Sequence, residues 1–339
     1  MKITKFRAAT GHDKDYVLEF CKNTFSWGDY IDRVWDIWIR EPNSLFLVAV
    51  NVNEENKIEK PIAIAHGILI PEKIIWMEGI RVDPKHRSHK LATNMSLHIL
   101  DYAKKQGVLY SSAIVSINNE ASKGLMEKLG FKVISTWSYL SIKPIVLPAL
   151  NNFNKDNSSS SFIIKVANLN EYQSVLNFLN HSEIFKNSGK KFVNSWRWYD
   201  LTEDRIRMMI NNKQVILVNN DDNNNDDPVT LKKGENKKIR GIAIIDEEGY
   251  WNNDKILQIV YIEAESDELL LSLVIKILEL ITLKEHKKND GKKKMYIKNN
   301  NKYERVQIFS PSPIKANSLI LQKFNVNFSE QFLLYHKEI

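Results

Sequence analysis

Cysteine is nearly absent, because the 339 residues include only Cys21. One thiol excludes a disulfide within the chain, and cysteine-poor chains are typical of reducing compartments. Long apolar runs are missing as well, since none approaches the roughly 18 residues of a membrane-spanning helix. The opening residues, MKITKFRAATGHDKDY, lack the apolar core of a secretory signal. We therefore expect a cytoplasmic protein that does not associate with membranes.

An excess of acidic residues is also absent, and the formal net charge is +7. A basic chain can indicate nucleic-acid binding. Here, however, many lysines gather at 232–238 and 284–294, near Asn- and Asp-rich segments, and no nucleic-acid motif accompanies them. Nucleic acid is therefore not the expected partner. The length and the hydrophobic fraction of 43% fit a globular chain of two domains.

What the sequence does contain is one informative stretch, residues 74–131. Residues 74–82 are largely apolar and β-favouring and stop at an Asp-Pro pair, which predicts a strand. A polar loop follows at 85–90. Apolar residues then recur at helical spacing across 91–102, and a second strand is predicted at 108–117. The stretch therefore reads strand, basic loop, helix, strand.

The basic loop occupies a position that favours anions. A loop between a strand end and a helix N-terminus leaves backbone N–H groups unpaired and faces the positive end of the helix dipole. Lysine, arginine and histidine side chains add positive charge across 85–90. The expected guest is a phosphate group.

Two segments resemble the signatures of the GNAT family of N-acetyltransferases. Arg87-Ser88-His89-Lys90-Leu91-Ala92 is similar to the acetyl-CoA motif Arg/Gln-x-x-Gly-x-Gly/Ala, with Lys90 in place of the first glycine. Residues 119–131 resemble the second signature, Asn-x-x-Ala-x-x-Leu-Tyr-x-Lys-x-Gly-Phe, with Met126 in place of the tyrosine. An unrelated strand-helix-strand unit with a solvated turn would leave this ordered pair of signatures unexplained.

The resemblance implies an α/β (α+β) fold with two GNAT-like domains, each a mixed, mostly antiparallel twisted sheet flanked by helices. Residues 1–145 have the element order of a GNAT domain. Residues 146–161 end in four serines and are expected to be a linker. Residues 162–339 repeat the first half in outline, as a diverged GNAT-like domain. The segment Trp196-Arg197-Trp198-Tyr199 is expected in a helical region of this second domain.

The second half differs from the first where phosphate would bind. Its counterpart of the motif strand is followed by 265–268, which has three carboxylates and neither arginine nor glycine. Carboxylates suit a helix N-terminus but repel a pyrophosphate. The second domain is therefore expected not to bind acetyl-CoA, and instead to build part of the acceptor site or to stabilise the first domain.

The resemblance implies acetyl-CoA as co-substrate and no metal. Backbone groups of 80–82 would pair with the pantetheine arm, and 87–92 would hold the pyrophosphate. The expected cofactor-binding residues are Ile80, Arg81, Val82, Arg87, Ser88, His89, Lys90, Leu91, Ala92, Asn119, Ser122 and Met126.

Glu78 is the expected general base. It is a carboxylate in an otherwise apolar strand, where partial desolvation raises a pKa, and by resemblance it matches the catalytic glutamate of many GNAT enzymes. Met126 cannot donate a proton, so the general acid stays open. Candidates for proton handling are Tyr139, a water, His66, His86 and His89, or the thiolate leaves unassisted.

An aromatic turn before the first strand pair is expected to bind the acceptor. Trp27, Asp29 and Tyr30 fall at the turn between two predicted helices, where Asp29 could hold an ammonium and a ring could add cation–π attraction. Trp35 and Trp38 are three residues apart on the second helix, and their favoured role is packing against the sheet.

The expected function is acetyl transfer to a primary amine of an amino acid or other small molecule. The tandem layout is similar to that of histidine N-acetyltransferase-like proteins. Two alternatives remain: a protein N-terminal or lysine acetyltransferase, and an inactive GNAT scaffold that binds or regulates. The sequence leaves the oligomeric state open.

Overall fold

A computed structural model describes most of the chain, namely residues 2–25, 28–53, 58–142, 162–220, 238–246, 256–288, 303–311, 318–324 and 326–339. The segment expected to be a linker, 146–161, and the acceptor candidate Trp27 lie outside these ranges. Within the described residues, no helix combines the length and apolar character needed to cross a bilayer. The chain divides into two compact units, one of Met1–Ile134 with Leu333–Ile339 and one of Ser135–Phe332.

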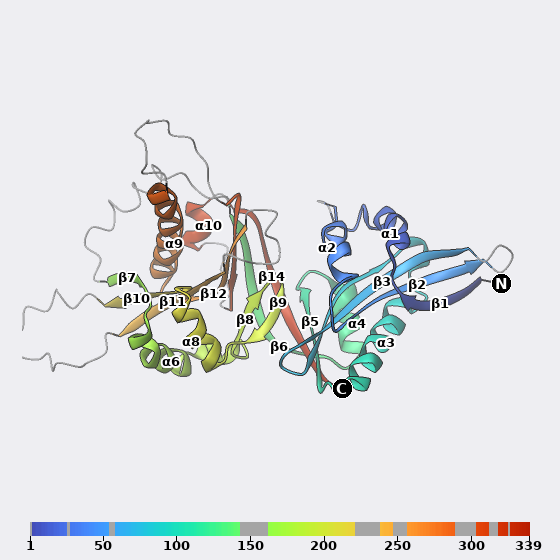
Figure 1. The fold of residues 1–339 in the computed structure, drawn as a ribbon, viewed down its shortest axis with the longest axis horizontal. Coiled ribbons are helices and arrows are strands. Elements are labelled where there is room, and N and C mark those ends of the chain that lie inside the picture. The colour runs from blue at the N-terminus through green and yellow to red at the C-terminus, as the bar shows by residue number, and fades with distance from the viewer. Residues whose placement is uncertain are drawn as a thin grey trace, which may run out of the picture. The chain divides into compact units, whose positions relative to one another are not determined.

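Unit 1 is a mixed sheet with helices on both faces (Figure 1). Its strand order is β1-β2-β3-β4-β5-β14, antiparallel from β1 to β4 and parallel between β4 and β5. Its elements are β1 (Lys2–Ala8), η1 (Gly11–Asp13), α1 (Lys14–Cys21), α2 (Ile31–Trp38), β2 (Ser44–Asn53), β3 (Glu59–Ile70), β4 (Ile74–Val82), η2 (Pro84–His86), α3 (Leu91–Lys105), β5 (Tyr110–Ser116), α4 (Glu120–Lys128) and the end of β14 (Val326–Glu338).

Successive residues of β3 point to opposite faces of the sheet, one covered by α3 and the other by α2. A Cβ on Gly67 would lie 2.5 Å from Ile99 of α3, so Gly67 lets this helix approach the sheet closely. The neighbouring residue His66 points to the other face and stacks on Trp38 of α2. Trp35 and Trp38 are buried there, in agreement with the packing role predicted for them.

Unit 2 repeats this sequence of strand pairings. Its order is β14-β6-β13-β12-β11-β10-β7, with β12 and β13 parallel as β4 and β5 are. Its elements are β6 (Lys132–Ile142), β7 (Phe162–Val166), η3 (Leu169–Glu171), α6 (Tyr172–His181), α7 (Glu183–Asn187), β8 (Lys191–Asn194), β9 (Arg197–Asp200), α8 (Glu203–Asn211), β10 (Val215–Asn220), β11 (Ile239–Asp246), β12 (Ile256–Ala264), α9 (Asp267–Lys288), β13 (Arg305–Ser310), α10 (Leu319–Lys323) and the start of β14. The α/β fold class predicted from the sequence is confirmed.

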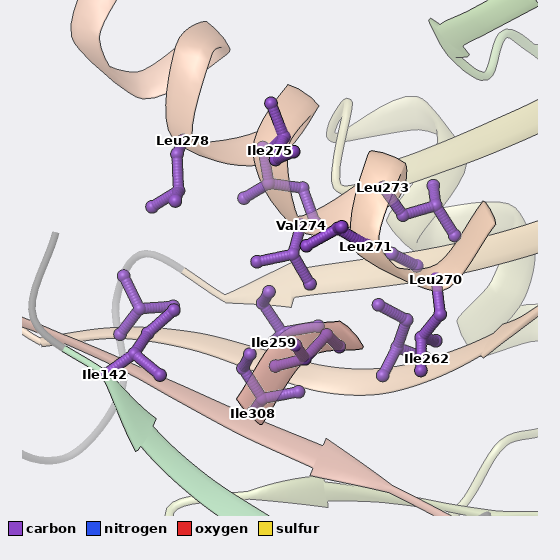
Figure 2. Close-up of a cluster of buried hydrophobic side chains, with 14 of the residues drawn as sticks. Ile142, Ile259, Ile262, Leu270, Leu271, Leu273, Val274, Ile275, Leu278 and Ile308 are labelled. Carbon is purple, nitrogen blue, oxygen red and sulfur yellow. The ribbon is translucent and has the colours of Figure 1, made fainter. Parts of the chain in front are cut away.

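The core of unit 2 forms where α9 covers the sheet. Figure 2 shows Leu270, Val274 and Leu278 of α9 above Ile259 and Ile308 of the strands. Ile142 of β6 joins the same cluster, since β6 pairs antiparallel with β13. These contacts explain why β6 from Ser135 onward belongs to unit 2, although the sequence places it in a first domain of 1–145.

The helical expectation for Trp196-Arg197-Trp198-Tyr199 is wrong. Residues 191–200 form a hairpin of β8 and β9, with Lys191 opposite Asp200 and Asn194 opposite Arg197. Ser195 and Trp196 both have positive φ, 53° and 66°, as a two-residue hairpin turn of the favoured twist requires. Aromatic residues favour strands, and here that preference decides the local structure.

The last residues of the chain complete unit 1. Tyr335 is 1% exposed and lies in the core cluster that contains Met126, Leu129 and Phe131. The Ile339 N–H donates to the Leu109 carbonyl at 3.0 Å. The first compact unit therefore depends on a strand from the opposite end of the sequence.

Replacing Tyr335 with alanine is expected to lower the free energy of unfolding of unit 1 by about 3 kcal/mol, because it removes a buried aromatic ring and leaves a cavity. Urea denaturation would measure the loss, and hydrogen exchange would locate it in residues 1–134. Glu338→Ala, at the exposed end of the same strand, is the control and should change stability by less than about 0.5 kcal/mol. Equal effects of the two variants would contradict this account of β14.

Candidate active site

A bulge in β4 shapes the site. The register between β3 and β4 shifts between Ile64 and His66, which pair with Arg81 and Glu78, so β4 holds one extra residue. Gly79 lies in that bulge with φ +67°, and a Cβ there would come within 2.4 Å of the Trp38 ring. Both the backbone conformation and the close ring exclude a larger residue.

Beyond its first residues, β4 separates from β5. Their described pairing runs from Ile74 with Tyr110 to Trp76 with Ser112, whereas β4 continues to Val82. Parallel strands that diverge leave a row of N–H and C=O groups on one edge of β4, which an extended chain can pair with. The expected pantetheine-binding residues 80–82 lie on this part of β4.

The loop after β4 and the start of α3 contain the residues for which the sequence predicts anion binding. Asp83 caps η2 by accepting from the Lys85 N–H at 2.9 Å. Ser88 and Lys90 have positive φ, 66° and 58°, and Lys90 is the N-cap of α3 without a side-chain capping bond. The first turn of α3 has no acidic residue. Alternating backbone handedness before a helix N-terminus gathers N–H groups that suit an anion.

Glu78 contacts a buried histidine. Its Oε1 lies 2.9 Å from Nδ1 of His66, which is fully buried, and Oε2 of Glu41 lies 3.7 Å from Nε2 of the same ring. Glu78 itself keeps 15% of its side chain exposed. The imidazole therefore lies between two partly exposed carboxylates.

The same three residues are also a candidate cation site. One ligand atom from each of Glu41, His66 and Glu78 lies within 4.8 Å of the others. Histidine nitrogen with two carboxylates is a donor set that several divalent metals accept. The expectation that the site needs no metal therefore stays a prediction.

Aromatic side chains enclose this group. His66 stacks on Trp38 at 4.5 Å with an interplanar angle of 7°, and Tyr30 meets Trp38 edge-on at 6.2 Å. Burial raises the pKa of Tyr30, so its hydroxyl stays protonated at neutral pH. Glu78, the predicted general base, thus bonds a histidine that is packed against aromatic rings.

Comparison with known proteins assigns a family to this part of the chain. Residues 14–131 match the acetyltransferase (GNAT) family model. Unit 1 carries a GNAT acetyltransferase domain. The match spans α1 to the end of the second signature and so includes both motifs on which the resemblance was based. No curated protein sequence matches the chain.

Solved structures are similar to this chain at low sequence identity. A GCN5-related N-acetyltransferase from Sphaerobacter thermophilus is 10% identical, with a TM-score of 0.56 over 99% of this chain and 95% of that one. The ribosomal-protein-S18-alanine N-acetyltransferase from Escherichia coli is 18% identical, with a TM-score of 0.33 over 40% of this chain and 81% of that one. The PaiA N-acetyltransferase from Thermoplasma acidophilum, solved with coenzyme A, is 19% identical, with a TM-score of 0.31 over 39% and 91%. The similarity to the Sphaerobacter thermophilus protein is one of fold, and it extends over nearly the whole chain.

Asp29 has an internal role in the GNAT domain, which argues against the ammonium contact predicted for it. Its carboxylate accepts two bonds from Arg81, at 2.7 and 3.1 Å, and one from the Tyr30 N–H at 2.7 Å. The Asp29 side chain is 5% exposed. The Arg81 guanidinium also lies 5.1 Å from the rings of Phe25 and Tyr30. The Arg81 side chain therefore fixes the turn before α2. The pantetheine contact predicted for Arg81 can then involve only its backbone N–H and C=O groups, which lie in β4.

Three residues from the second signature and β6 have internal contacts in the structure. Met126 is 3% exposed within the apolar core, so its side chain packs against the sheet instead of facing a cofactor. Asn119 caps α4 by accepting from the Ser122 N–H at 3.0 Å. Tyr139 belongs to unit 2, where its hydroxyl accepts from Gln307 at 3.1 Å.

Two residues near the site were not singled out from the sequence. Glu41 lies in the turn after α2, where no periodicity signals a role. His336 of β14 bonds Ser112 through Nδ1 at 2.9 Å and stacks on Tyr110 at 5.0 Å, beside the point where β4 and β5 separate. The position of His336 beside β5 could be predicted only by knowing that β14 pairs with β5 in unit 1.

Replacing Lys90 with glycine is expected to raise the free energy of unfolding by about 1 kcal/mol, because a non-glycine residue at φ 58° carries left-handed strain. Chemical denaturation would measure the gain. The control is Lys85→Gly, which removes the same charge from the same loop at a residue without positive φ. A loss of stability in Lys90→Gly would show that the lysine side chain supports the loop.

Proposed function

We propose that the GNAT domain transfers an acetyl group from acetyl-CoA to a primary amine, with Glu78 as general base. The observation that carries this proposal is the position of Glu78. It stands at the β4 bulge, just past the last pair with β5, and bonds a fully buried histidine. A carboxylate held this way can accept a proton beside a strand edge suited to a thioester arm.

The chemistry needs a neutral amine. Glu78 takes a proton from the ammonium, directly or through a water, and His66 and Glu41 form a polar path behind it. The amine nitrogen then forms a bond to the thioester carbonyl carbon. Backbone N–H groups near the bulge stabilise the oxyanion, and the C–S bond breaks to release the CoA thiolate. The remaining amine proton leaves to solvent or to the thiolate.

Transfer is direct and does not pass through a protein thiol. Cys21 is the one cysteine of the chain and is 1% exposed. Burial raises the pKa of its thiol to about 12, so almost no thiolate forms at neutral pH. A covalent acetyl-cysteine intermediate therefore lacks its nucleophile.

The pyrophosphate of CoA is proposed to bind the loop before α3. Arg87, Ser88, His89 and Lys90 are exposed there, and the helix begins at the buried Leu91 with Ala92 behind it. Backbone N–H groups would hold the phosphate oxygens and Arg87 would add charge. Lys90 already adopts the left-handed backbone for which the motif favours glycine.

The proposed acceptor is an amino acid or another small amine. Tyr30 and Trp38 provide aromatic surfaces close to Glu78, which suit a cation before it loses its proton. Because Asp29 is bonded to Arg81, we assign the ammonium contact to Glu78 and Glu41, the two carboxylates beside His66. Protein N-termini and lysines remain alternative acceptors.

We also propose that unit 2 is a diverged copy of the GNAT fold. Its pairing order repeats that of unit 1, and β12 has a bulge at the same place, between the partners of Ile244 and Ile245. Ile259 of β12 stands where β4 has Glu78, and Glu265 before α9 is paired with Lys238 and Arg240. Within the residues of unit 2 that the structure describes, this strand and loop therefore have no counterpart of Glu78 or of the basic loop.

A second candidate is a GNAT scaffold that binds CoA without turnover. The observation that favours it is Met126, which replaces the usual tyrosine and is buried. Tests of binding and of turnover separate the two candidates.

Acetyl-CoA is expected to bind the full chain with micromolar affinity in calorimetry. Arg87→Glu should weaken binding by at least about tenfold, because it places a like charge at the phosphates. The control is Lys104→Glu, an equal charge reversal at the other end of α3, which should leave affinity unchanged. Absence of binding in the unaltered protein would overturn the proposed function.

Glu78→Gln is expected to lower kcat/KM for acetyl transfer by about 100-fold or more while acetyl-CoA affinity stays unchanged, because the amide keeps the shape but cannot accept the proton. CoA release with a panel of amines and amino acids would measure it. Glu19→Gln, a matched change on an exposed side chain of α1, should have no effect. If unaltered protein binds acetyl-CoA and turns over no amine, the scaffold candidate stands instead.

A further inference from the structure

A serine and a histidine are bonded to each other beside the candidate active site. Nδ1 of His336 on β14 lies 2.9 Å from the Ser112 hydroxyl on β5, and the imidazole stacks on the Tyr110 ring at 5.0 Å with an interplanar angle of 27°. Ser112 is 4% exposed, whereas His336 is only half-buried. Two contacts therefore hold the imidazole in one orientation, and part of the residue stays accessible.

This pair faces the same side of the sheet as Glu78. Ser112 is the β5 partner of Trp76, so these two side chains share a face, and Glu78 follows two residues later on β4, before the bulge. On β14, Tyr335 points into the core under α3, so its neighbour His336 points to the other face. Both residues of β14 lie in the part of the strand that completes unit 1, so the pair and the carboxylate belong to one compact unit.

The spacing between Glu78 and Ser112 suits an α-amino acid. One strand across and two residues along correspond to roughly 8 Å between Cα atoms, and side chains on one face of a sheet keep about this spacing. An ammonium and a carboxylate on the same carbon place nitrogen and oxygen roughly 3 Å apart, and a hydrogen bond of about 2.8 Å at each end extends the span to roughly 8–9 Å. A ligand bonded to Glu78 through its ammonium can therefore reach the pair through its carboxylate.

The chemistry of the pair suits a carboxylate in either tautomer of the histidine. A serine and a neutral imidazole carry two polar hydrogens between them, and the bond inside the pair uses one. Protonation of the imidazole adds a further hydrogen and a positive charge. Arg81, the arginine of β4, is already bonded to Asp29 through two nitrogens. The carboxylate contact is therefore assigned to His336.

We propose that His336 binds a carboxylate of the acceptor, and that the acceptor is therefore an amino acid and not a simple amine. Ser112 acts as a positioning residue, because its hydroxyl fixes the orientation of the imidazole. Glu78 receives the ammonium end, as in the proposed acetyl transfer, on which this inference rests. The proposed function admits any small amine, and His336 is the residue that narrows the choice to amino acids.

The test compares amino acids with the amines that lack only the carboxylate: L-histidine with histamine, L-phenylalanine with 2-phenylethylamine, and L-alanine with ethylamine. The full chain is supplied with acetyl-CoA, and CoA release gives kcat/KM for each acceptor. At least one amino acid should exceed its matching amine by about tenfold or more, because a site that bonds a group of the substrate discriminates against the analogue without it.

His336→Phe keeps a ring that can stack on Tyr110 and removes both nitrogens. It should lower kcat/KM for the amino acid by about tenfold or more and leave the matching amine unchanged, whereas a purely structural role would lower both alike. Comparing the variant with the unaltered protein cancels the different basicities of the acceptors. Ser112→Ala should act in the same direction, and the double variant should lose no more than His336→Phe, since both act through one contact.

The control is Ser111→Ala, the neighbouring serine on the other face of β5. Its hydroxyl is buried and, within the described part of the chain, has no hydrogen-bond partner, so this variant should leave the preference for the amino acid unchanged.

Two results would overturn the carboxylate contact while acetyl transfer stands: amines turned over as well as the amino acids, or an equal loss for both members of a pair in His336→Phe. If the unaltered protein acetylates none of the six acceptors, the choice of an amino acid is wrong as well. The measurement of acetyl-CoA binding then decides separately whether the proposed function survives.

Discussion

The close contact between Gly79 and the Trp38 ring is the constraint on which the candidate active site depends. The ring occupies the space a Cβ would need, and it stacks on His66 from the neighbouring strand. The bulge that Gly79 permits turns β4 where its pairing with β5 has ended. Thus one aromatic ring sets the position of the histidine, the strand edge and, through both, the carboxylate of Glu78.

Around this contact the polar groups of unit 1 have distinct tasks. Asp29 and Arg81 form a shielded ion pair that closes the turn before α2, and they leave little charge for a ligand. Glu41, His66 and Glu78 keep a path of titratable groups from the interior to the surface. Positive side chains are instead found at 85–90, in the loop before α3. Carboxylates that can take a proton from an amine, together with a basic loop that can hold phosphates, suit the proposed transfer of an acetyl group from CoA to an amine.

Local sequence signals predicted the parts of this site that depend on neighbours in the chain. The strand at 74–82, the helix after the basic loop and the position of Glu78 follow from alternation, turn residues and helical spacing. Contacts between distant residues could not be predicted this way: Glu41 beside His66, and Tyr335 in the core of unit 1. The hairpin at 191–200 was missed because its turn has positive φ at Ser195 and Trp196, which neither residue type signals.

The C-terminal strand also bears on how the protein is made. The GNAT domain is encoded first, yet its sheet is completed by Leu333–Ile339, after the 198 residues of Ser135–Phe332. At translation rates of about 5–20 residues per second, roughly 10–40 s pass between synthesis of the two parts. During that interval the edge of β5 and the apolar surface that Tyr335 later covers are exposed on the nascent chain. Unit 1 is therefore completed only after unit 2 has been synthesised, and a translation product interrupted before Leu333 would have both GNAT motifs without the complete sheet.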